Sequence, residues 1–343
     1  MTAEVPQTGV PQTGIPQNCR AFQLAETAEG VRGGFTTVPV GELGRGELLI
    51  RASLSSVNYK DALAATGRGK VARRLPLVGG IDVAGAVETS DDPRFTPGER
   101  VLVTGFGLSE DCDGGYAEWV RVPADWAVPV PVGMTDWEAM ALGTAGITSA
   151  LAVHELESNG VRPGDGPVVV TGATGGSGSL AVSMLAGLGY DVTAVTGNAA
   201  RTDYLQQLGA SRILPRPEVP ERPRPLESAE WAGAVDCVGG QTLAWLIRTM
   251  RRHGVIATFG NAGGNDLPTS VLPFILRGVR LIGVNTGYFD NQLRHALWQR
   301  MAGDLRPSAL DTIARTVGFD DLPASLESLV EGANTGRVVV ELR

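Results

Sequence analysis

The sequence predicts an α/β protein with two parts, a β-rich part and a doubly wound, mostly parallel sheet. Three observations lead to this prediction. The 343 residues are enough for two domains, each with its own hydrophobic core. Residues 35–132 carry short apolar and β-branched runs that are separated by glycine and proline. Beyond residue 157, strand-like and helix-like segments alternate, which is typical of parallel sheets.

Composition and charge exclude several classes of protein. The net charge is −8 and the pI is about 5.1, without the basic stripe that binds nucleic acid. No apolar run approaches the roughly 20 residues of a membrane helix, and no secretory leader is apparent at the N-terminus. The three cysteines are an odd number and far apart, so no disulfide framework is expected. We therefore expect a cytoplasmic protein that binds neither nucleic acid nor membranes.

The first part of the chain begins with a tail. Residues 5–18 nearly repeat a Pro-Gln-Thr-Gly unit and lack apolar periodicity, so residues 1–19 are expected to be flexible. Strands are then expected at residues 47–53, 85–89, 100–104 and 116–122. A long helical region over residues 137–157 follows, with an interruption near residues 143–146.

The second part alternates between strands and helices. Strands are expected at residues 167–171, 191–195, 212–214, 234–238, 255–259 and 279–284. Helices are expected at residues 179–188, 200–208 and 242–252. The apolar run at residues 337–342 is typical of a strand, which we expect to return to the first part.

A glycine-dense turn gives the strongest chemical signal. The apolar residues 168–170 are followed by Thr-Gly-Ala-Thr-Gly-Gly-Ser-Gly at 171–178, and a helix is expected directly afterwards. Glycines let the backbone approach a pyrophosphate, and the helix presents free N–H groups and the positive end of its dipole. The position between a strand and a helix favours a dinucleotide site over a glycine-rich connection without a ligand.

The next strand indicates which dinucleotide binds. In NAD sites an acidic residue about 20 positions further on binds the 2′-hydroxyl of the ribose. Here the strand ends in Thr196-Gly197-Asn198, without an acid. Hydroxyl and amide groups accommodate a 2′-phosphate, and Arg201 or Arg216 would add positive charge. The sequence therefore favours NADPH; the alternative, in which Asp203 reaches back to the ribose, is disfavoured because a helix is expected there.

A zinc site is not expected. Catalytic zinc needs three protein ligands and an open position. The histidines are His154, His253 and His295, and no pair of them falls at ligand spacing with a cysteine. His154 is expected to be a packed helix residue, and three cysteines cannot form a four-cysteine structural site. We therefore predict no bound metal.

Several further segments form recognisable motifs: Ser-Ser-Val-Asn-Tyr-Lys-Asp-Ala-Leu at 55–63, Gly-Gly-Ile-Asp-Val-Ala-Gly at 79–85, Asp-Pro-Arg-Phe at 92–95, Gly-Thr-Ala-Gly at 143–146, the turn at 171–178, Leu-Pro-Arg at 214–216, and Leu-Pro-Phe-Ile-Leu-Arg-Gly-Val-Arg-Leu at 272–281. Together they resemble one branch of the medium-chain dehydrogenase/reductase superfamily, the acryloyl-CoA reductase and YhdH/YhfP-type quinone oxidoreductase group. In zinc-dependent relatives a Gly-His-Glu stands where this chain has Gly-Ile-Asp82, which supports the zinc-free interpretation.

The resemblance implies a fold and an activity. It implies a GroES-like β-barrel domain from residues 20–145 and 288–343, and a Rossmann NADPH-binding domain from residues 146–287. It also implies a homodimer and reduction of the C=C bond of a short α,β-unsaturated acyl-CoA, such as acryloyl-CoA, by hydride transfer to the β-carbon. The implied cofactor contacts are Tyr59, Thr174, Gly175, Gly176, Ser177, Thr196, Gly197, Asn198, Arg216, Asn261 and Thr286.

The chain departs from the group at two places. The group often has Ser-Gly-Arg where this chain has Thr196-Gly-Asn198, which leaves Arg216 as the main cation for a 2′-phosphate. A His-containing stretch usual near the cleft is replaced by Glu-Asp-Cys-Asp at 110–113. The reaction also needs a donor for the developing charge or for the α-carbon proton, and our candidate is Tyr59, with Asn58 behind it; the alternative is a structural loop with a packed ring.

A basic run offers a candidate substrate contact. Arg68, Lys70, Arg73 and Arg74 place four cations within seven residues. They would attract the phosphates of a CoA thioester, or they form an ordinary solvated surface loop.

Two other functions remain open. One is a quinone or enone oxidoreductase with the same fold and cofactor site, which would also act on a small molecule. The other is a non-catalytic NADPH-binding sensor.

Overall fold

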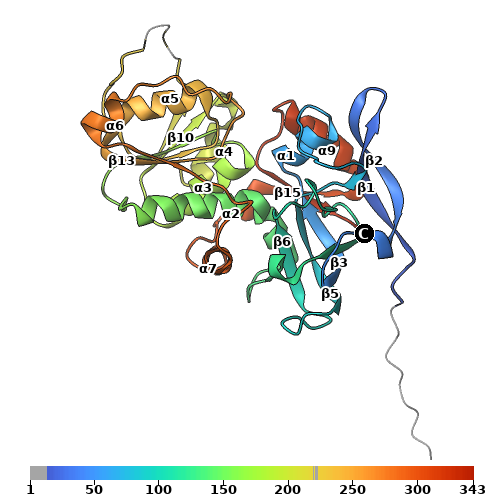
Figure 1. The fold of residues 1–343 in the computed structure, drawn as a ribbon. Coiled ribbons are helices and arrows are strands. Elements are labelled where there is room, and N and C mark those ends of the chain that lie inside the picture. The colour runs from blue at the N-terminus through green and yellow to red at the C-terminus, as the bar shows by residue number, and fades with distance from the viewer. Residues whose placement is uncertain (1–13, 219, 221–222) are drawn as a thin grey trace, which may run out of the picture.

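The computed structural model describes residues 14–218, 220 and 223–343, which form two bodies joined by one long helix (Figure 1). Most of the predicted flexible tail lies outside the described residues. The last two positions of that predicted tail, Asn18 and Cys19, belong to the first strand, where the Cys19 side chain is buried.

The first body is β-rich and takes strands from both ends of the chain. A small antiparallel sheet has the order β2-β1-β4, with bounds β1 (Asn18–Thr27), β2 (Gly30–Pro39) and β4 (Leu77–Val78). The larger sheet has the order β15-β16-β3-β5-β6-β8, with bounds β3 (Leu48–Ser56), β5 (Asp82–Ser90), β6 (Arg100–Thr104), β8 (Val128–Pro129), β15 (Ala314–Gly318) and β16 (Arg337–Glu341). A further strand, β7 (Trp119–Val122), pairs with β3. Because β16 pairs antiparallel with β3, the C-terminal strand does return to the first part, as the sequence predicted.

Short helices complete this body. They are η1 (Val40–Glu42), α1 (Tyr59–Ala65), η2 (Ala124–Trp126), α8 (Leu310–Ile313), η4 (Phe319–Asp321) and α9 (Leu322–Val330).

The second body is a parallel sheet of six strands in the order β11-β10-β9-β12-β13-β14. The strands are β9 (Val168–Thr171), β10 (Val192–Thr196), β11 (Arg212–Pro215), β12 (Trp231–Asp236), β13 (Met250–Thr258) and β14 (Arg280–Gly283). The helices are α3 (Gly176–Gly187), α4 (Thr202–Gln207), α5 (Gly240–Thr249) and α6 (Leu272–Arg277), with a short η3 (Ala199–Arg201). The order reverses at β9, which lies between β10 and β12, so this is a doubly wound sheet with its switch point at β9.

Both faces of the parallel sheet are covered, which explains its continuous apolar strands. Val168 and Val170 of β9 belong to the core that includes α2 and α3, whereas Val169 belongs to the core that includes α5. Figure 1 shows α3 below the sheet and α5 above it. The predicted α/β fold class is therefore confirmed.

The long helix α2 (Asp136–Ser158) joins the two bodies and is bent at Gly143. Its N-terminus is fixed by a capping box between Thr135 and Glu138. Gly143 has φ 50° and ψ −151°, and a Cβ built there would lie 2.5 Å from Oδ2 of Asp82. Only glycine fits this position. The break that the sequence predicted near 143–146 is thus the point where α2 meets the first body.

Several predicted boundaries were wrong, as two examples show. The helix expected over 242–252 ends at Thr249, because Met250 already pairs with Trp231 as the first residue of β13. The strand expected over 116–122 begins only at Trp119. One further helix, α7 (Asn291–Ala302), packs against α2. Among the described residues, no helix is long and apolar enough to cross a lipid bilayer.

Candidate functional site

The glycine-dense turn connects β9 to α3 at the switch point of the sheet. Gly172 has φ 61°, and a Cβ on Gly178 would lie 2.3 Å from the carbonyl oxygen of Gly172, so the turn is as tight as glycine allows. Gly175 is the N-cap of α3 and offers no side chain to the first N–H groups of the helix. These N–H groups are therefore available to an anion at the carboxyl edge of the sheet.

The turn is held by the far end of the chain. The Gly336 N–H donates to the Thr174 carbonyl oxygen at 3.0 Å, and a Cβ on Gly176 would lie 2.8 Å from Cδ of Arg337. The segment before β16 in the first body thus rests directly on the turn of the second. Sequence reasoning missed this contact, because nothing local to residues 336–337 signals it.

The end of β10 gathers the residues predicted to bind a 2′-phosphate. The Thr196 hydroxyl accepts from the Asn198 N–H at 3.0 Å and lies 3.3 Å from the Thr174 hydroxyl. A Cβ on Gly197 would lie 3.4 Å from Nη2 of Arg216, so this guanidinium covers the glycine. The structure therefore brings Thr196, Gly197, Asn198 and Arg216 together beside the turn.

A buried carboxylate organises the neighbouring strand ends. Asp236 accepts hydrogen bonds from the hydroxyls of Thr171 at 2.7 Å and Thr258 at 2.8 Å, and from the N–H groups of Val238 and Gly239. One side chain thus ties the carboxyl ends of β9, β12 and β13 together. Asn261 lies just after β13, and a Cβ on Gly239 would lie 3.3 Å from its Cα, so this predicted contact lies at the same edge.

Thr286 follows β14, the last strand of the sheet. Its hydroxyl lies 2.9 Å from the hydroxyl of Thr148 on α2, and its carbonyl oxygen accepts from Arg294 at 2.9 Å. It is therefore fixed from both sides, at the place where the two bodies meet.

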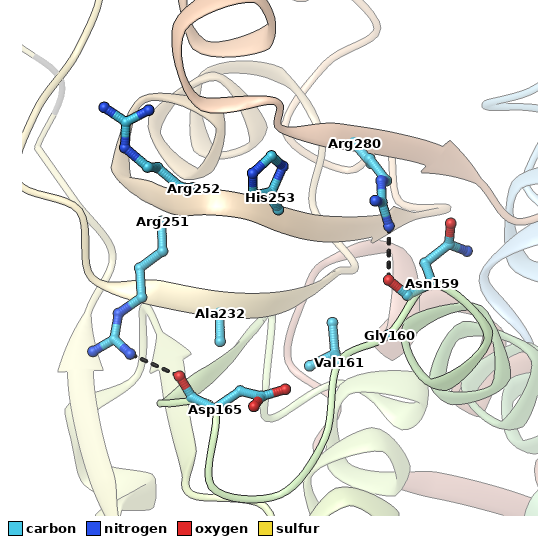
Figure 2. A pocket seen from close by; sticks show the side chains of 9 residues that line it. All are labelled: Asn159, Gly160, Val161, Asp165, Ala232, Arg251, Arg252, His253 and Arg280. Atoms are coloured by element: carbon cyan, nitrogen blue, oxygen red, sulfur yellow. Dashed lines mark hydrogen bonds between the residues drawn. The ribbon is translucent and has the colours of Figure 1, made fainter.

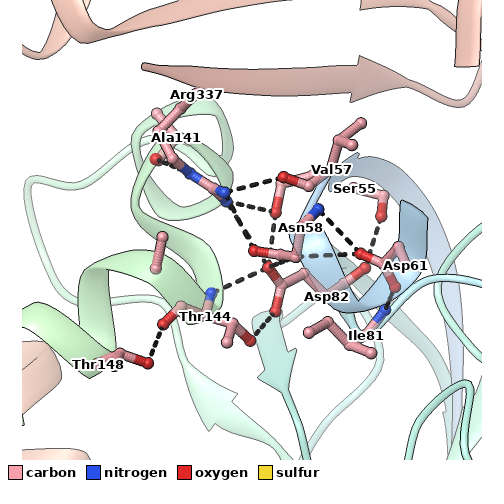
Figure 3. A network of polar contacts seen from close by, with 12 residues as sticks. Ser55, Val57, Asn58, Asp61, Ile81, Asp82, Ala141, Thr144, Thr148 and Arg337 are labelled. Atoms are coloured by element: carbon pink, nitrogen blue, oxygen red, sulfur yellow. Dashed lines mark hydrogen bonds and ion pairs between the residues drawn. The ribbon is translucent and has the colours of Figure 1, made fainter. Parts of the chain in front are cut away.

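A second buried carboxylate, Asp82, forms the centre of a polar network (Figure 3). Its Oδ2 accepts from the Ser56 hydroxyl at 2.6 Å, from the Asn58 amide at 2.8 Å and from the Thr144 N–H at 2.9 Å. Nη2 of Arg337 lies 3.8 Å from the same oxygen. The network joins β3, β5, α1, α2 and β16. Sequence reasoning identified only Asn58 among its members.

Asn58 is fully engaged in this network. It is the N-cap of α1, its amide nitrogen donates to Asp82, and its amide oxygen accepts from Arg337 at 3.0 Å. Its side chain therefore holds α1 in place and has no donor directed at a ligand. Tyr59, the first residue of α1, is different, because the residue is 41% exposed.

The carboxyl group of Asp61 lies beside the same network. It accepts from the backbone and side-chain nitrogens of Asn58 and from the N–H of Ile81 at 3.0 Å. Burial, reinforced by the negative charge of Asp82, raises the pKa of Asp61 to about 7, and the hydrogen bonds from Asn58 and Ile81 only partly oppose this shift.

The basic run at 68–74 is largely ion-paired. Arg68 pairs with Glu327 at 3.6 Å, Arg73 with Glu110 at 3.6 Å, and Arg74 with Asp113 at 3.2 Å. Glu110 also pairs with Lys60, the neighbour of Tyr59. Among the described residues, Lys70 is the member of the run without an ion pair. The four cations thus carry less free charge than the sequence suggested.

No cluster of three or more His, Cys, Asp or Glu residues able to hold a metal ion occurs in the part of the chain that the structure describes. The donors around Asp82 are hydroxyls, an amide and a guanidinium, which do not suit zinc. His154 is half-buried on α2, and its Nε2 lies 3.3 Å from the Ser158 hydroxyl on the same helix.

A separate cavity of about 220 Å³ lies at the amino edge of the parallel sheet (Figure 2). Arg251 and Arg280 line it, but each donates to a backbone carbonyl, that of Asp165 at 2.9 Å and that of Asn159 at 2.7 Å. None of the predicted site residues lines it. Ligands of doubly wound sheets bind at the opposite, carboxyl edge, so we assign the site there.

Comparison with known proteins places this geometry in a family. Residues 44–132 match the model of the alcohol dehydrogenase GroES-like domain, and residues 176–303 match that of the zinc-binding dehydrogenases. The chain is 44% identical to the putative quinone oxidoreductase YhfP of Bacillus subtilis, over 94% of this chain and 98% of that protein. It is 47% identical to the probable acrylyl-CoA reductase AcuI of Escherichia coli, over 89% and 94%. The chain belongs to the acrylyl-CoA reductase and YhdH/YhfP oxidoreductase family.

Solved structures of this family superpose closely. The YhdH oxidoreductase of Salmonella enterica in complex with NADP has a TM-score of 0.92 and 44% identity, covering 94% of this chain and 100% of that one. The YhdH of Escherichia coli with bound NADPH has a TM-score of 0.91 and 45% identity, with the same coverage. The yhfP protein of Bacillus subtilis, with NAD bound, has a TM-score of 0.91 and 43% identity, covering 95% and 100%. The predicted family is therefore confirmed, with its GroES-like and Rossmann parts.

Asp61 should make the stability of the protein depend on pH. Its pKa is about 7 in the folded chain and about 3.9 when unfolded, so between these values only the folded chain keeps the proton. The free energy of unfolding should therefore fall as pH rises from about 4 to 7, by up to about 1.4 kcal/mol per pH unit. Denaturant unfolding at several pH values should show a shallower fall for Asp61→Asn. The exposed Asp266→Asn is the control, and equal slopes for all three proteins would contradict the assignment.

Proposed function

We propose that the chain is an NADPH-dependent reductase of the conjugated C=C bond of a short α,β-unsaturated acyl-CoA, of the acryloyl-CoA type. The observation that carries the cofactor half of this proposal is Arg216, whose guanidinium covers Gly197 at the end of β10, a position that lacks an acid. A 2′-phosphate would meet a cation there, whereas a bare ribose would find no carboxylate. The NADP-bound and NADPH-bound relatives support the same choice.

The residues that would hold the cofactor lie along the carboxyl edge of the sheet. The N–H groups at 176–178 would bind the pyrophosphate, whereas the Gly175 N–H donates to the Gly172 carbonyl oxygen and the Thr174 carbonyl oxygen accepts from Gly336. Thr196, Asn198 and Arg216 would bind the phosphorylated ribose. Asn261 and Thr286, after β13 and β14, would border the nicotinamide half.

The protein itself would position the cofactor and the substrate and stabilise the charge that develops during the reaction. Bound NADPH supplies the hydride that adds to the β-carbon of the thioester. Negative charge then develops on the thioester oxygen, where a hydrogen-bond donor lowers the barrier, and a proton delivered to the α-carbon by water or a tyrosine completes the reduction. Tyr59 is the proposed donor, because its ring is partly exposed at the start of α1, whereas Asn58 is occupied by Asp82 and Arg337. We also propose that the reaction needs no zinc, since a guanidinium and hydroxyls surround the buried carboxylate.

The basic run would contribute to CoA binding mainly through Lys70, because Arg68, Arg73 and Arg74 are already paired with acids. Exposed ion pairs are weak, however, and exchange easily for a phosphate partner. The proposal therefore keeps all four cations as candidate contacts of the CoA phosphates.

We propose that the protein acts in the cytoplasm as a homodimer. Among the described strands, β14 is one of the two edges of the parallel sheet, and an unpaired edge readily pairs with a second chain. The adjacent α6 exposes Ile275 and Leu276, with Val271 just before it. Such an apolar surface beside a free strand edge suits a two-fold interface.

The substrate is tested by NADPH consumption with acryloyl-CoA, crotonyl-CoA and simple quinones. We expect kcat/KM for acryloyl-CoA to exceed that for the quinones. The opposite order would favour the quinone or enone reductase that the YhfP name suggests for that relative. Binding of NADPH without oxidation by any of these compounds would favour the non-catalytic sensor.

The cofactor choice is tested by Arg216→Gln. We expect the Kd for NADPH to rise about tenfold or more, because one charged hydrogen bond to the 2′-phosphate is lost. The Kd for NADH should not change. Arg212→Gln is the matched control, because Arg212 is the first residue of β11, the strand that Arg216 follows, and it pairs with Glu230. Loss of affinity for both dinucleotides, or for neither, would contradict the assignment of Arg216.

The donor is tested by Tyr59→Phe. Removing the hydroxyl should lower kcat about 10²-fold with little change in the KM for NADPH. Tyr190→Phe is the control, because the Tyr190 hydroxyl donates to the Val161 carbonyl oxygen, away from the proposed cleft. An unchanged kcat in Tyr59→Phe would remove the donor role, and a raised KM for NADPH alone would assign the ring to the cofactor.

A further inference from the structure

Arg294 of α7 is a buried arginine between the two bodies. The residue is only 1% exposed. Nη1 donates to the carbonyl oxygen of Thr104 at 3.1 Å and approaches its hydroxyl at 3.3 Å, while Nη2 donates to the carbonyl oxygen of Thr286 at 2.9 Å. One guanidinium thus joins the end of β6 in the first body to the loop after β14 in the second.

Two aromatic rings hold this guanidinium. Its central carbon lies 4.1 Å from the ring centroid of Phe106 and 4.3 Å from that of Phe289. Phe106 is stacked in turn on Trp126, with centroids 5.6 Å apart and planes within 7°. Phe106 also has φ 57°, a left-handed conformation that costs free energy in a bulky residue. The loop after β6 is thus strained in the conformation in which its ring reaches Arg294.

The charge of Arg294 has no carboxylate partner within 4.0 Å among the residues that the structure describes. Burial lowers the pKa of Arg294 to about 10, and the charge of Asp82 only partly opposes this shift. A buried cation without an ion pair is costly, and an apolar side chain of similar size would fill the space without that cost. Packing alone therefore does not account for an arginine at this position.

The loop that Arg294 holds borders the proposed cleft. A doubly wound sheet binds one half of a dinucleotide on each side of its switch point, and Thr286 lies beyond β9 on the side opposite Arg216. The Thr286 hydroxyl contacts Thr148, and a Cβ on Gly105 would lie 3.5 Å from the Thr286 carbonyl oxygen. The loops after β6 and β14 therefore touch at the nicotinamide end.

We propose that Arg294 is a positioning residue, which sets the nicotinamide end of the cleft by fixing the Thr286 loop against the Phe106 loop. The inference rests on the proposed function in one respect, the binding of NADPH along the carboxyl edge of the sheet. It requires that removing Arg294 disturbs the nicotinamide half of the cofactor and spares the adenine half.

The test compares NADPH with adenosine 2′,5′-bisphosphate, which carries only the adenine half. In Arg294→Met we expect the Kd for NADPH to rise about tenfold, with the Kd for the bisphosphate unchanged. The nicotinamide fluorescence of bound NADPH should shift toward that of the free cofactor. Turnover should fall up to about 10²-fold, because a small displacement of a reacting centre has an effect of that size. Arg294→Lys keeps the charge but not the planar guanidinium. Its Kd for NADPH and its turnover should lie between those of the wild type and those of Arg294→Met.

Arg300→Met is the matched control on the same helix. Arg300 pairs with Glu157 of α2 at 2.6 Å and with Asp304 at 2.6 Å, and it contacts neither loop. This variant should lower Tm without changing either Kd. Should Arg294→Met fail to fold, the Lys variant carries the same comparison.

Two results would overturn the inference: equal weakening of both ligands in the Arg294 variants, or a lowered Tm with unchanged NADPH affinity and turnover. A wild-type chain that binds NADPH but reduces no acyl-CoA would overturn only the proposed substrate, and the binding comparison would still decide the role of Arg294. A wild-type chain that does not bind NADPH would overturn both proposals.

Discussion

The structure depends on the burial of one carboxylate, that of Asp82, where the two bodies meet. Its oxygens accept from β3, α1 and α2, and Arg337 of β16 lies beside it, so elements separated by more than 200 residues converge on one group. A buried charge that loses one donor is strongly destabilised. The bend of α2 at Gly143 follows from this, because only a residue without a side chain lets the helix approach Asp82 so closely.

The same region connects the fold to the proposed chemistry. Arg337 donates to Asn58, the N-cap that directs α1 and its first residue, Tyr59, while the neighbouring Gly336 donates to the turn at Thr174. The proposed catalytic side chain and the proposed pyrophosphate turn are therefore positioned by two adjacent residues, Gly336 just before β16 and Arg337 at its start. A carboxylate with a raised pKa, Asp61, is held by Asn58 as well. Displacement of this strand would alter both halves of the site together.

The sequence predicted the elements whose conformation depends on neighbouring residues alone. The strand, glycine turn and helix at 168–187 were predictable because glycine content and apolar runs fix them without reference to the rest of the chain. The break in α2 was visible for the same reason. The role of Asn58 was not, since its partners Asp82 and Arg337 lie 24 and 279 residues away. The basic run was likewise interpreted without its acidic partners. Three of its four cations form ion pairs with Glu110, Asp113 and Glu327.

Buried arginines were the least predictable members of the site, and a physical reason explains why. An arginine in a sequence is read as a surface residue, because desolvating a guanidinium is costly unless acceptors surround it. For Arg294 the acceptors are carbonyls of Thr104 and Thr286, which every residue possesses, so no sequence pattern marks them. Backbone acceptors also impose geometry, since a planar fork satisfies two carbonyls only at one relative placement of the two loops. A buried arginine of this kind determines the relative position of two loops more than it adds to the free energy of unfolding.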